Sequence, residues 1–340
     1  MLTALGQTMK RSGAVLIAVA VLIIYAPQIL AAELTFGEIA NAVVRVEATI
    51  KPGARTARTL GLERTGSGVV IDDNGLVLTI GYLIMESETV RLTTRAGKST
   101  AADVVAYDHR SGFGLVRARG ELELKPLALG SSADLQQGTP LLILSMGTMG
   151  GVTPVRVGSR RPFAGPWEYL LDNAIYTFPP HREFGGAALV DLHGSLLGVG
   201  SLFVGNATDP DSETPGNMFV PIDLLKPILA KMVKTGKSGQ VPRPWIGVYA
   251  AVSEGRVFVN RLASDGPGAE AGLKTGDIIV GVRGRRVGDL ADLFRKVWAE
   301  GAAGTDVTLD ILPLGSPNLE IKKVVIRSKN RHQWLQLGRD

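Results

Sequence analysis

Short runs of alternating apolar and polar residues recur along most of the chain. Residues 43–50 (VVRVEATI) have a period of two, which places one face of a strand on a core. An Asp-Asn-Gly turn interrupts the apolar run at 65–79 and predicts a hairpin, because Asn-Gly tolerates positive φ. With forty-two glycines and only 6% aromatic residues, the pattern predicts a mainly β chain. Further strands are expected at 90–94, 104–107, 141–145, 152–158, 169–177, 218–220, 256–260, 307–312 and 321–326.

Three segments have helical periodicity instead. Residues 35–42 predict a short helix that leads into the first strand, and residues 222–234 predict an amphipathic helix despite Pro227. Between 234 and 244 the chain is polar, contains glycine and ends in proline, which is typical of a linker between domains. Beyond it, residues 289–298 carry apolar side chains at the spacing i, i+3, i+4 and i+7, namely Leu290, Leu293, Phe294 and Val297.

The N-terminal segment is typical of export. Lys10 and Arg11 precede an uncharged stretch from 12 to 32, whose densest apolar part suits the h-region of a secretory signal. Cleavage after Ala31-Ala32 is one possibility; the stretch is also long enough to remain as a membrane anchor. We therefore expect residues 1–34 to be a signal peptide or an N-terminal anchor. The protein would lie in the periplasm or cell envelope, either soluble or attached to the inner membrane through residues 12–32.

Composition excludes several classes of function. The formal charge of +5 comes without a block of five or six basic residues, so the sequence predicts no nucleic-acid partner. The absence of cysteine excludes disulfides, thiol catalysis and thiolate metal sites. His181 and Glu183 are two residues apart on a loop, which is not a metal-binding spacing, and no glycine-rich stretch has phosphate-loop spacing. We predict no metal and no cofactor, and we expect His109 to be a solvated loop residue.

Residues 181–203 have the layout of a nucleophile loop and its following hairpin. The chain reads His181-Arg-Glu-Phe-Gly-Gly-Ala-Ala-Leu-Val-Asp-Leu-His-Gly194, and this resembles Gly-Asn-Ser-Gly-Gly-Pro-Leu-Val of the HtrA/Deg-type serine proteases, which have the chymotrypsin fold. Aligning Leu189-Val190 and the turn glycine Gly194 places Gly185 at the serine position. A shift by one residue would place Phe184 there, which also has no hydroxyl group.

The other two positions of the catalytic triad are changed as well. Where the family has Leu-Thr-Asn-x-His-Val-Val, residues 78–84 read Leu-Thr-Ile-Gly-Tyr-Leu-Ile, so the histidine position is Tyr82. Where it has Asp-x-x-x-Asp-Leu-Ala-Val-Leu, residues 108–116 place Gly112 at the second aspartate. Triad chemistry needs a hydroxyl, an imidazole and a carboxylate that orients it. Glycine supplies no side-chain group, and a phenol with a pKa of about 10 is a poor base near neutral pH.

The resemblance leaves only a vestigial oxyanion hole. It would use the backbone N–H groups of Glu183 and Gly185, and the Glu183 carboxylate opposes a developing anion beside it. We therefore predict no catalytic residues in this domain. A working serine endopeptidase of the HtrA family, acting in envelope protein quality control, remains the alternative.

A second resemblance begins after the linker. Residues 266–280 read Gly-Pro-Gly-Ala-Glu-Ala-Gly-Leu-Lys-Thr-Gly-Asp-Ile-Ile-Val, which is similar to Pro-Ala-x-x-Ala-Gly-Leu-x-x-Gly-Asp-x-Ile of HtrA-type PDZ domains. This implies that the loop 245–248 receives a peptide carboxylate on its backbone N–H groups, and that the next strand pairs with the peptide by β-augmentation. The implied peptide-binding residues are Trp245, Ile246, Gly247 and Val248, with Leu290, Leu293, Phe294 and Val297 as groove wall.

Other interpretations of these residues stay open. All four helix residues could belong to the core, and Trp245 could pack between domains. The stretch 160–169 (RRPFAGPWEY) could line a peptide cleft or form a rigid structural loop.

Together these patterns predict a chymotrypsin-like or trypsin-like double β-barrel at 35–235, a linker at 236–244, a PDZ domain at 245–328 and a polar tail at 329–340. The function that we expect is that of an exported HtrA-like pseudoprotease, which binds peptides or protein C-termini. A membrane-anchored scaffold without a peptide ligand is a weaker alternative. The resemblance also implies a possible homo-oligomer, a trimer.

Overall fold

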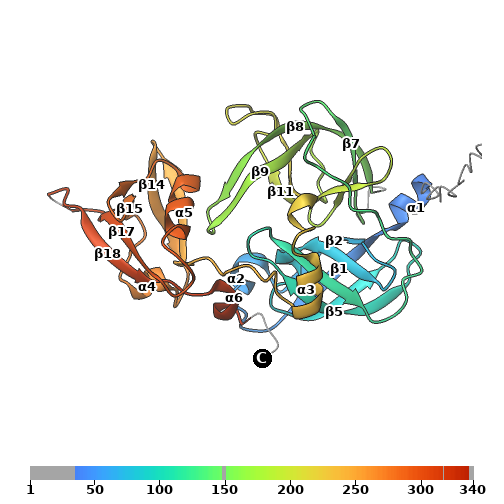
Figure 1. Cartoon of the computed structure of the whole chain (residues 1–340), viewed down its shortest axis with the longest axis horizontal. Helices are drawn as coiled ribbons and strands as arrows, with labels where there is room; N and C mark the ends of the chain where they lie inside the picture. Colours follow the sequence, from blue (N-terminus) through green and yellow to red (C-terminus); the bar gives the residue numbers. More distant parts are fainter. Residues whose placement is uncertain (1–34, 148–150, 317, 337–340) are drawn as a thin grey trace, which may run out of the picture. The chain divides into compact units, whose positions relative to one another are not determined.

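The computed structural model describes residues 35–147, 151–316 and 318–336. The predicted signal peptide or anchor lies outside the described residues. Two closed antiparallel barrels and a third antiparallel sheet make up this part of the chain, which confirms the prediction of a mainly β protein (Figure 1). None of the described helices is long and apolar enough to cross a membrane.

The first barrel follows a short capped helix. Helix α1 (Phe36–Asn41) begins at Thr35, whose side chain and that of Glu38 form a reciprocal capping box. The barrel closes in the order β1-β2-β3-β6-β5-β4. Its strands are β1 (Val43–Ile50), β2 (Glu63–Val70), β3 (Leu76–Ile80), β4 (Ser87–Thr93), β5 (Ser99–Tyr107) and β6 (Phe113–Ala118). Two short helices stand in its loops, α2 (Ala57–Leu60) and the 3-10 helix η1 (Gly81–Leu83).

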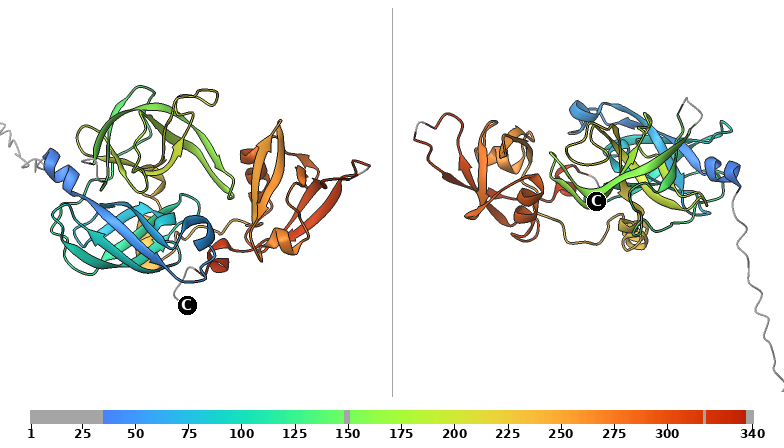
Figure 2. Two further views of the ribbon diagram at one scale, coloured as in Figure 1. Left: turned by 180° about the vertical axis from the view of Figure 1, so that it is seen from behind. Right: turned by 90° about the horizontal axis from the view of Figure 1, so that it is seen from above.

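The second barrel closes in the order β10-β11-β12-β9-β8-β7. Its strands are β7 (Pro140–Leu144), β8 (Val152–Gly165), β9 (Tyr169–Phe178), β10 (Ala188–Val190), β11 (Leu196–Val204) and β12 (Gly216–Pro221). β8 is twice as long as the strand expected from the sequence. The stretch 160–169, expected as a loop or cleft lining, is therefore the end of a long hairpin, with a three-residue turn between Gly165 and Tyr169 (Figure 2).

The helix predicted at 222–234 is wrong as a single element. The structure has a 3-10 helix η2 (Ile222–Leu224) and then α3 (Leu229–Thr235), which ends at the left-handed Gly236. Pro227 lies between them. It has no N–H group to donate, and its ring clashes with a helical carbonyl four residues earlier, so one continuous helix cannot form.

The third sheet has the order β13-β14-β15-β17-β18, with the short β16 paired to β15. Helix α5 begins after Asp289, whose carboxylate accepts a hydrogen bond from the Asp292 N–H and caps the helix. The elements are β13 (Val248–Ser253), β14 (Arg256–Leu262), α4 (Pro267–Glu270), β15 (Ile278–Val282), β16 (Arg285–Arg286), α5 (Leu290–Trp298), β17 (Asp306–Leu312) and β18 (Lys322–Arg327).

The segment expected as a polar tail begins with a packed helix. Lys329 exchanges two backbone hydrogen bonds with Trp245, and α6 (Arg331–Trp334) follows. The Trp334 ring lies 4.4 Å from the Trp245 ring between centroids, and its indole N–H donates to the Asp265 carbonyl. Aromatic burial explains the ordering, which the polar composition of this segment did not reveal.

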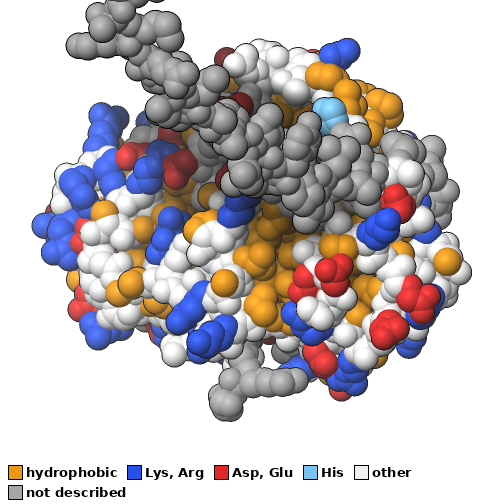
Figure 3. Space-filling model, turned by 45° about the vertical axis from the view of Figure 1, so that its right-hand side comes forward, with side chains coloured by type: hydrophobic (Ala, Val, Ile, Leu, Met, Phe, Trp, Pro, Cys, Tyr) orange, Lys and Arg blue, Asp and Glu red, His pale blue; other side chains and the backbone are white. Residues whose placement is uncertain are grey.

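The surface of the protein carries both signs of charge. On the face shown in Figure 3, Lys and Arg side chains lie beside Asp and Glu side chains, and apolar side chains gather near the centre. This mixture agrees with the small net charge of +5.

Candidate functional site

The positions aligned with the nucleophile and the base lie against each other. A Cβ atom built on Gly185 would stand 2.9 Å from the phenol oxygen of Tyr82. Gly185 comes from the loop before β10 in the second barrel, and Tyr82 from η1 in the first. The Tyr82 hydroxyl donates a hydrogen bond to the Ser201 carbonyl at 3.1 Å. A cavity of about 330 Å³ adjoins the pair, and its lining includes Ser67, Met146 and Glu183.

Tyr82 is poorly suited to proton transfer. Burial raises the pKa of its phenol well above the ordinary value. The hydroxyl therefore stays protonated at neutral pH and acts as a donor to the Ser201 carbonyl. A general base needs the opposite character, a pKa near the working pH and a free lone pair aimed at the nucleophile.

The loop around Gly185 is tied to both barrels by its backbone. The Gly185 carbonyl accepts a hydrogen bond from Ser67 N–H at 2.8 Å, and Gly186 N–H donates to the Gly200 carbonyl at 2.9 Å. Gly186 has φ +73°, and a Cβ there would lie 2.0 Å from the Ser67 carbonyl oxygen, so only glycine fits. The loop therefore has a fixed backbone shape without a nucleophile on it.

A carboxylate lies beside this loop. The Glu183 side chain sits against Gly147, so that a Cβ on Gly147 would overlap its carboxylate. The oxyanion hole predicted at the Glu183 and Gly185 N–H groups therefore has this carboxylate beside it.

The aspartate position, Gly112, faces a tyrosine. Gly112 has φ +82°, and a Cβ built on it would lie 3.2 Å from the Tyr169 hydroxyl, which donates to the Ser111 carbonyl at 2.5 Å. The Gly112 carbonyl accepts from Gly81 N–H at 2.7 Å, directly before Tyr82. The structure thus brings Gly112, Tyr82 and Gly185 into one region, with phenol groups where the family has imidazole and carboxylate.

One serine and histidine pair exists elsewhere in the second barrel. The His181 Nε2 lies 2.9 Å from Ser145 Oγ, and its Nδ1 lies 2.9 Å from Thr153 Oγ1. Ser145 is completely buried, so no substrate carbonyl reaches its hydroxyl. Burial lowers the pKa of His181, which keeps the ring neutral. The pair holds the interior of the barrel together.

His109 is not solvated, and that expectation is wrong. Its ring packs edge-on against Tyr107 and His332, and neither ring nitrogen has a hydrogen-bond partner among the residues that the structure describes. Burial, followed by the charges of Arg331 and His332, lowers its pKa well below the ordinary value. The cause is α6, which lies more than 200 residues away in the sequence and covers this ring.

The loop 245–248 binds a carboxylate of the same chain. The N–H groups of Ile246 and Val248 donate to the two side-chain oxygens of Glu168, at 3.1 and 3.0 Å. Gly247 between them has φ +74°, which turns successive N–H groups toward one point. Burial raises the pKa of Glu168 to about 7, and the backbone N–H groups and the Arg331 charge oppose that rise.

The expected groove wall lies beside this loop. Leu293, Phe294 and Val297 are buried in one apolar cluster with Ile246 and Val248, while Leu290 packs at its edge. Leu170 from β9 joins the same cluster and is 6% exposed. The Trp245 ring packs against Trp334 of α6.

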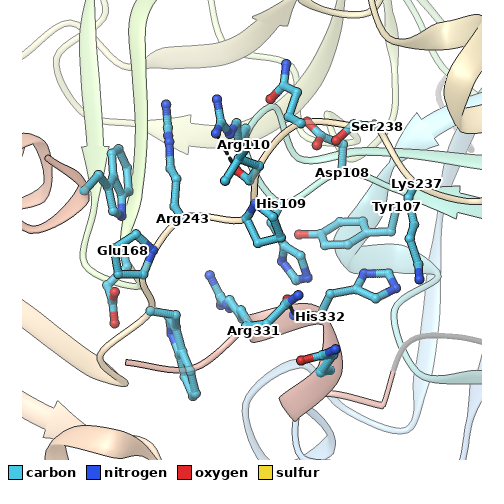
Figure 4. Close-up of a pocket in the computed structure, with 18 of the residues that line it drawn as sticks. Tyr107, Asp108, His109, Arg110, Glu168, Lys237, Ser238, Arg243, Arg331 and His332 are labelled. Atoms are coloured by element: carbon cyan, nitrogen blue, oxygen red, sulfur yellow. Dashed lines mark hydrogen bonds between the residues drawn. The ribbon is translucent and has the colours of Figure 1, made fainter. Parts of the chain in front are cut away.

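A pocket of about 360 Å³ opens next to Glu168 (Figure 4). It is rich in cationic and imidazole side chains: Figure 4 shows His109, Arg110, Lys237, Arg243, Arg331 and His332 there, together with Asp108 and Glu168. The Arg331 side chain donates to the Trp167 carbonyl at 2.9 Å and so fixes the turn before Glu168.

Sequence reasoning missed Glu168, Arg331 and Trp334. The pattern at residues 160–169 emphasises aromatic and arginine side chains, and nothing in it indicates a role for Glu168. Glu168 meets Ile246 across 78 positions of the chain, so no local spacing reveals the contact.

Two family models match the chain. Residues 66–199 match a trypsin-like peptidase domain, and residues 244–315 match a PDZ domain.

Curated relatives are serine proteases by name. HTRA1 of Xenopus tropicalis is 24% identical over 267 residues, which cover 70% of this chain and 55% of that protein. The periplasmic serine endoprotease DegP of Escherichia coli K12 is 26% identical over 277 residues, 76% of this chain and 57% of DegP. PepD of Mycobacterium tuberculosis is 28% identical over 305 residues, 82% of this chain and 64% of PepD. The chain thus spans little more than half of the length of these relatives.

Solved structures share the fold. A serine endoprotease from Yersinia pestis aligns with a TM-score of 0.51 at 23% identity, over 87% of this chain and 98% of that chain. The HtrA-type protease AlgW with a decapeptide aligns with a TM-score of 0.52 at 18% identity, again over 87% and 98%.

Proposed function

The chain belongs to the HtrA family, with a trypsin-like peptidase domain followed by a C-terminal PDZ domain, and we propose that this member is a pseudoprotease that binds peptides or protein C-termini. The contact between Tyr82 and Gly185 is the observation that supports the absence of protease activity. A phenol with a raised pKa fills the space beside a position that has no hydroxyl.

The binding half rests on the loop 245–248. Its N–H groups hold a carboxylate with two hydrogen bonds of 3.0 to 3.1 Å, and an apolar cluster adjoins them. A peptide C-terminus presents the same two features, a carboxylate and an apolar last side chain. The structure of AlgW was determined with a decapeptide, so an HtrA-type neighbour accommodates a short peptide.

We place the protein in the cell envelope. Support comes from the basic residues and apolar stretch at 10–32 and from the periplasmic location named for DegP. A homo-oligomer such as a trimer is part of the proposal, and analytical ultracentrifugation of the purified chain tests it.

A pair of peptides tests the binding proposal. An eight-residue peptide that ends in leucine with a free carboxylate should bind the full chain measurably, while its C-terminal amide should bind at least about tenfold more weakly, or roughly 1.4 kcal/mol. Gly247→Pro should weaken the free acid similarly, because proline cannot adopt the φ of +74° that directs the Ile246 and Val248 N–H groups toward one carboxylate. Equal affinity of acid and amide for the full chain would refute carboxylate recognition.

The names of the relatives favour one rival function, an active serine endopeptidase. It requires a reactive serine in the region 65–220. Cleavage of casein that disappears on mutation of such a serine would establish it.

A further inference from the structure

The turn between β8 and β9 meets the PDZ domain in the way that a peptide C-terminus does. We call residues 164–170 (AGPWEYL) the β8–β9 tip. Recognition of a C-terminus by a PDZ domain uses a carboxylate on the loop N–H groups, main-chain pairing with the adjacent strand, and an apolar side chain in the groove. The β8–β9 tip supplies all three.

The carboxylate is that of Glu168. Both side-chain oxygens accept hydrogen bonds, from Ile246 N–H and Val248 N–H, so the loop is saturated by one ligand. Glu168 is 7% exposed. A second carboxylate cannot reach the same N–H groups while Glu168 remains there.

The main-chain and apolar contacts follow. Ala250 N–H of β13 donates to the Pro166 carbonyl at 3.0 Å, so the tip pairs with the strand that follows the loop. Leu170 is buried in the cluster that contains Leu293, Phe294 and Val297 of α5. β8 and β9 both contact α5. The β8–β9 tip therefore lies between helix α5 and strand β13.

The backbone of Glu168 points to a functional reason for this residue. Its φ is +57°, in the left-handed region, at the last position of a three-residue hairpin turn. Glycine or asparagine is the usual residue for that conformation. A strained residue persists where surrounding contacts hold it, and such residues gather at ligand clamps and switches. Here the contacts are those of the carboxylate with the PDZ loop.

We propose that the β8–β9 tip is an internal ligand of the PDZ domain, which an incoming peptide C-terminus must displace; this regulation rests on the proposed peptide binding. Because the tip belongs to the same chain, it competes at an effective concentration far above that of a dilute peptide. The native protein therefore binds free peptides weakly, and release of the tip exposes the groove.

Two measurements on the full chain test the proposal. The first is hydrogen–deuterium exchange of residues 245–250, and the second is the affinity for a fluorescein-labelled eight-residue peptide that ends in leucine with a free carboxylate. Glu168→Gly removes the carboxylate and suits the left-handed turn, so the hairpin keeps its shape. We expect loss of protection at the Ile246 and Val248 amides and at least tenfold tighter peptide binding.

Two further variants provide controls. Glu168→Gln keeps the size and one acceptor oxygen but places an NH2 group against an N–H donor, so it should give a smaller change in the same direction. Asp306→Asn removes a carboxylate from β17, where it pairs with Arg327 of β18 at 3.2 Å in an exposed ion pair that involves neither the β8–β9 tip nor α5. It should change peptide affinity by less than about twofold, because exposed ion pairs contribute little.

The outcomes separate this proposal from the peptide-binding function. If the Ile246 and Val248 amides exchange equally slowly in Glu168→Gly and in the native chain, the tip is not an internal ligand, whatever the peptide affinity is. Lost protection with equal peptide affinity in the native and variant chains overturns the competition. Lost protection without peptide binding by either chain supports the internal ligand and overturns the proposed peptide binding.

Discussion

The phenol oxygen of Tyr82 lies 2.9 Å from the point at which a side chain on Gly185 would begin. In an active protease, an imidazole would occupy one of these positions and a serine the other. A serine introduced at Gly185 alone would therefore meet a phenol and not an imidazole.

Gly185→Ser should destabilise the protein and give no activity. Its Cβ is closer to the Tyr82 oxygen than a normal contact allows, so the ring must shift, at a cost of about 1–3 kcal/mol. Thermal unfolding measures the cost. Gly185→Ala carries the same Cβ without the hydroxyl and should lose a similar amount. Adding Tyr82→His should return most of the lost stability, since the smaller ring opens the space; no recovery would contradict the predicted clash.

Gly112→Asp should also destabilise, for two reasons. The backbone at φ +82° disfavours any residue with a Cβ by roughly 1–2 kcal/mol, and the new atom meets the Tyr169 hydroxyl at 3.2 Å. Tyr169→Phe removes that hydroxyl and should reduce the loss. A double-mutant cycle by chemical denaturation measures the coupling. Full additivity of the two changes would show that the contact is unimportant.

Peptide affinity of the native chain should rise with pH. The pKa of Glu168 is about 7 when docked and 4.5 at its ordinary value. The docked carboxyl therefore keeps its proton where the released one loses it, so docking is strongest below pH 4.5 and weakens as pH rises through about 7. We expect peptide affinity to increase about tenfold or more between about pH 5 and 8.

Glu168→Gln is the control for this pH profile, because residue 168 then has no titratable side chain and the part of the rise in affinity that Glu168 causes should disappear. The other charged or titratable groups near Glu168 are the same in both proteins, so their effect on the pH dependence of peptide affinity cancels in the comparison. They are Asp108, His109, Arg110, Lys237, Arg243, Arg331 and His332. The same profile in both proteins would exclude Glu168 as the titrating group.

Trp334→Ala should unfold the C-terminal helix and lower stability. The Trp334 ring contacts Trp245, lies 4.3 Å beneath the Arg55 guanidinium, and donates to the Asp265 carbonyl. Removing a half-buried ring of this kind costs on the order of 1–3 kcal/mol, less than a fully buried tryptophan. Leu314→Ala, at a side chain that is 72% exposed, should leave the unfolding curve unchanged. Equal curves for both variants would refute the structural role of α6.

Local patterns predicted local structure well. The alternation at 43–50 corresponds to β1 residue for residue, and the helix expected at 289–298 is α5 with Asp289 as its cap. Each of these patterns lies within a single element, because neighbouring residues set both the side-chain period and the N-terminal cap. The prediction failed at Pro227. The amphipathic pattern around this residue indicated one continuous helix, although proline has no N–H group for the helical hydrogen bond.

The candidate site depended on contacts that sequence spacing does not encode. The motifs identified Gly185, Tyr82, Gly112 and the loop 245–248, since each occupies a fixed place in a family pattern. They did not identify Glu168, whose partner is 78 residues away, or the burial of His109 under α6. Such contacts arise when separate elements pack, so they became visible only in three dimensions.

Covalent labelling by a fluorophosphonate, mapped by mass spectrometry on the full chain, shows whether the two barrels contain an activated serine. The reagent reacts with an activated serine, and a pseudoprotease domain has none. We predict no labelled residue and no casein cleavage above buffer. A stoichiometric adduct on any serine between residues 65 and 220 would contradict the account.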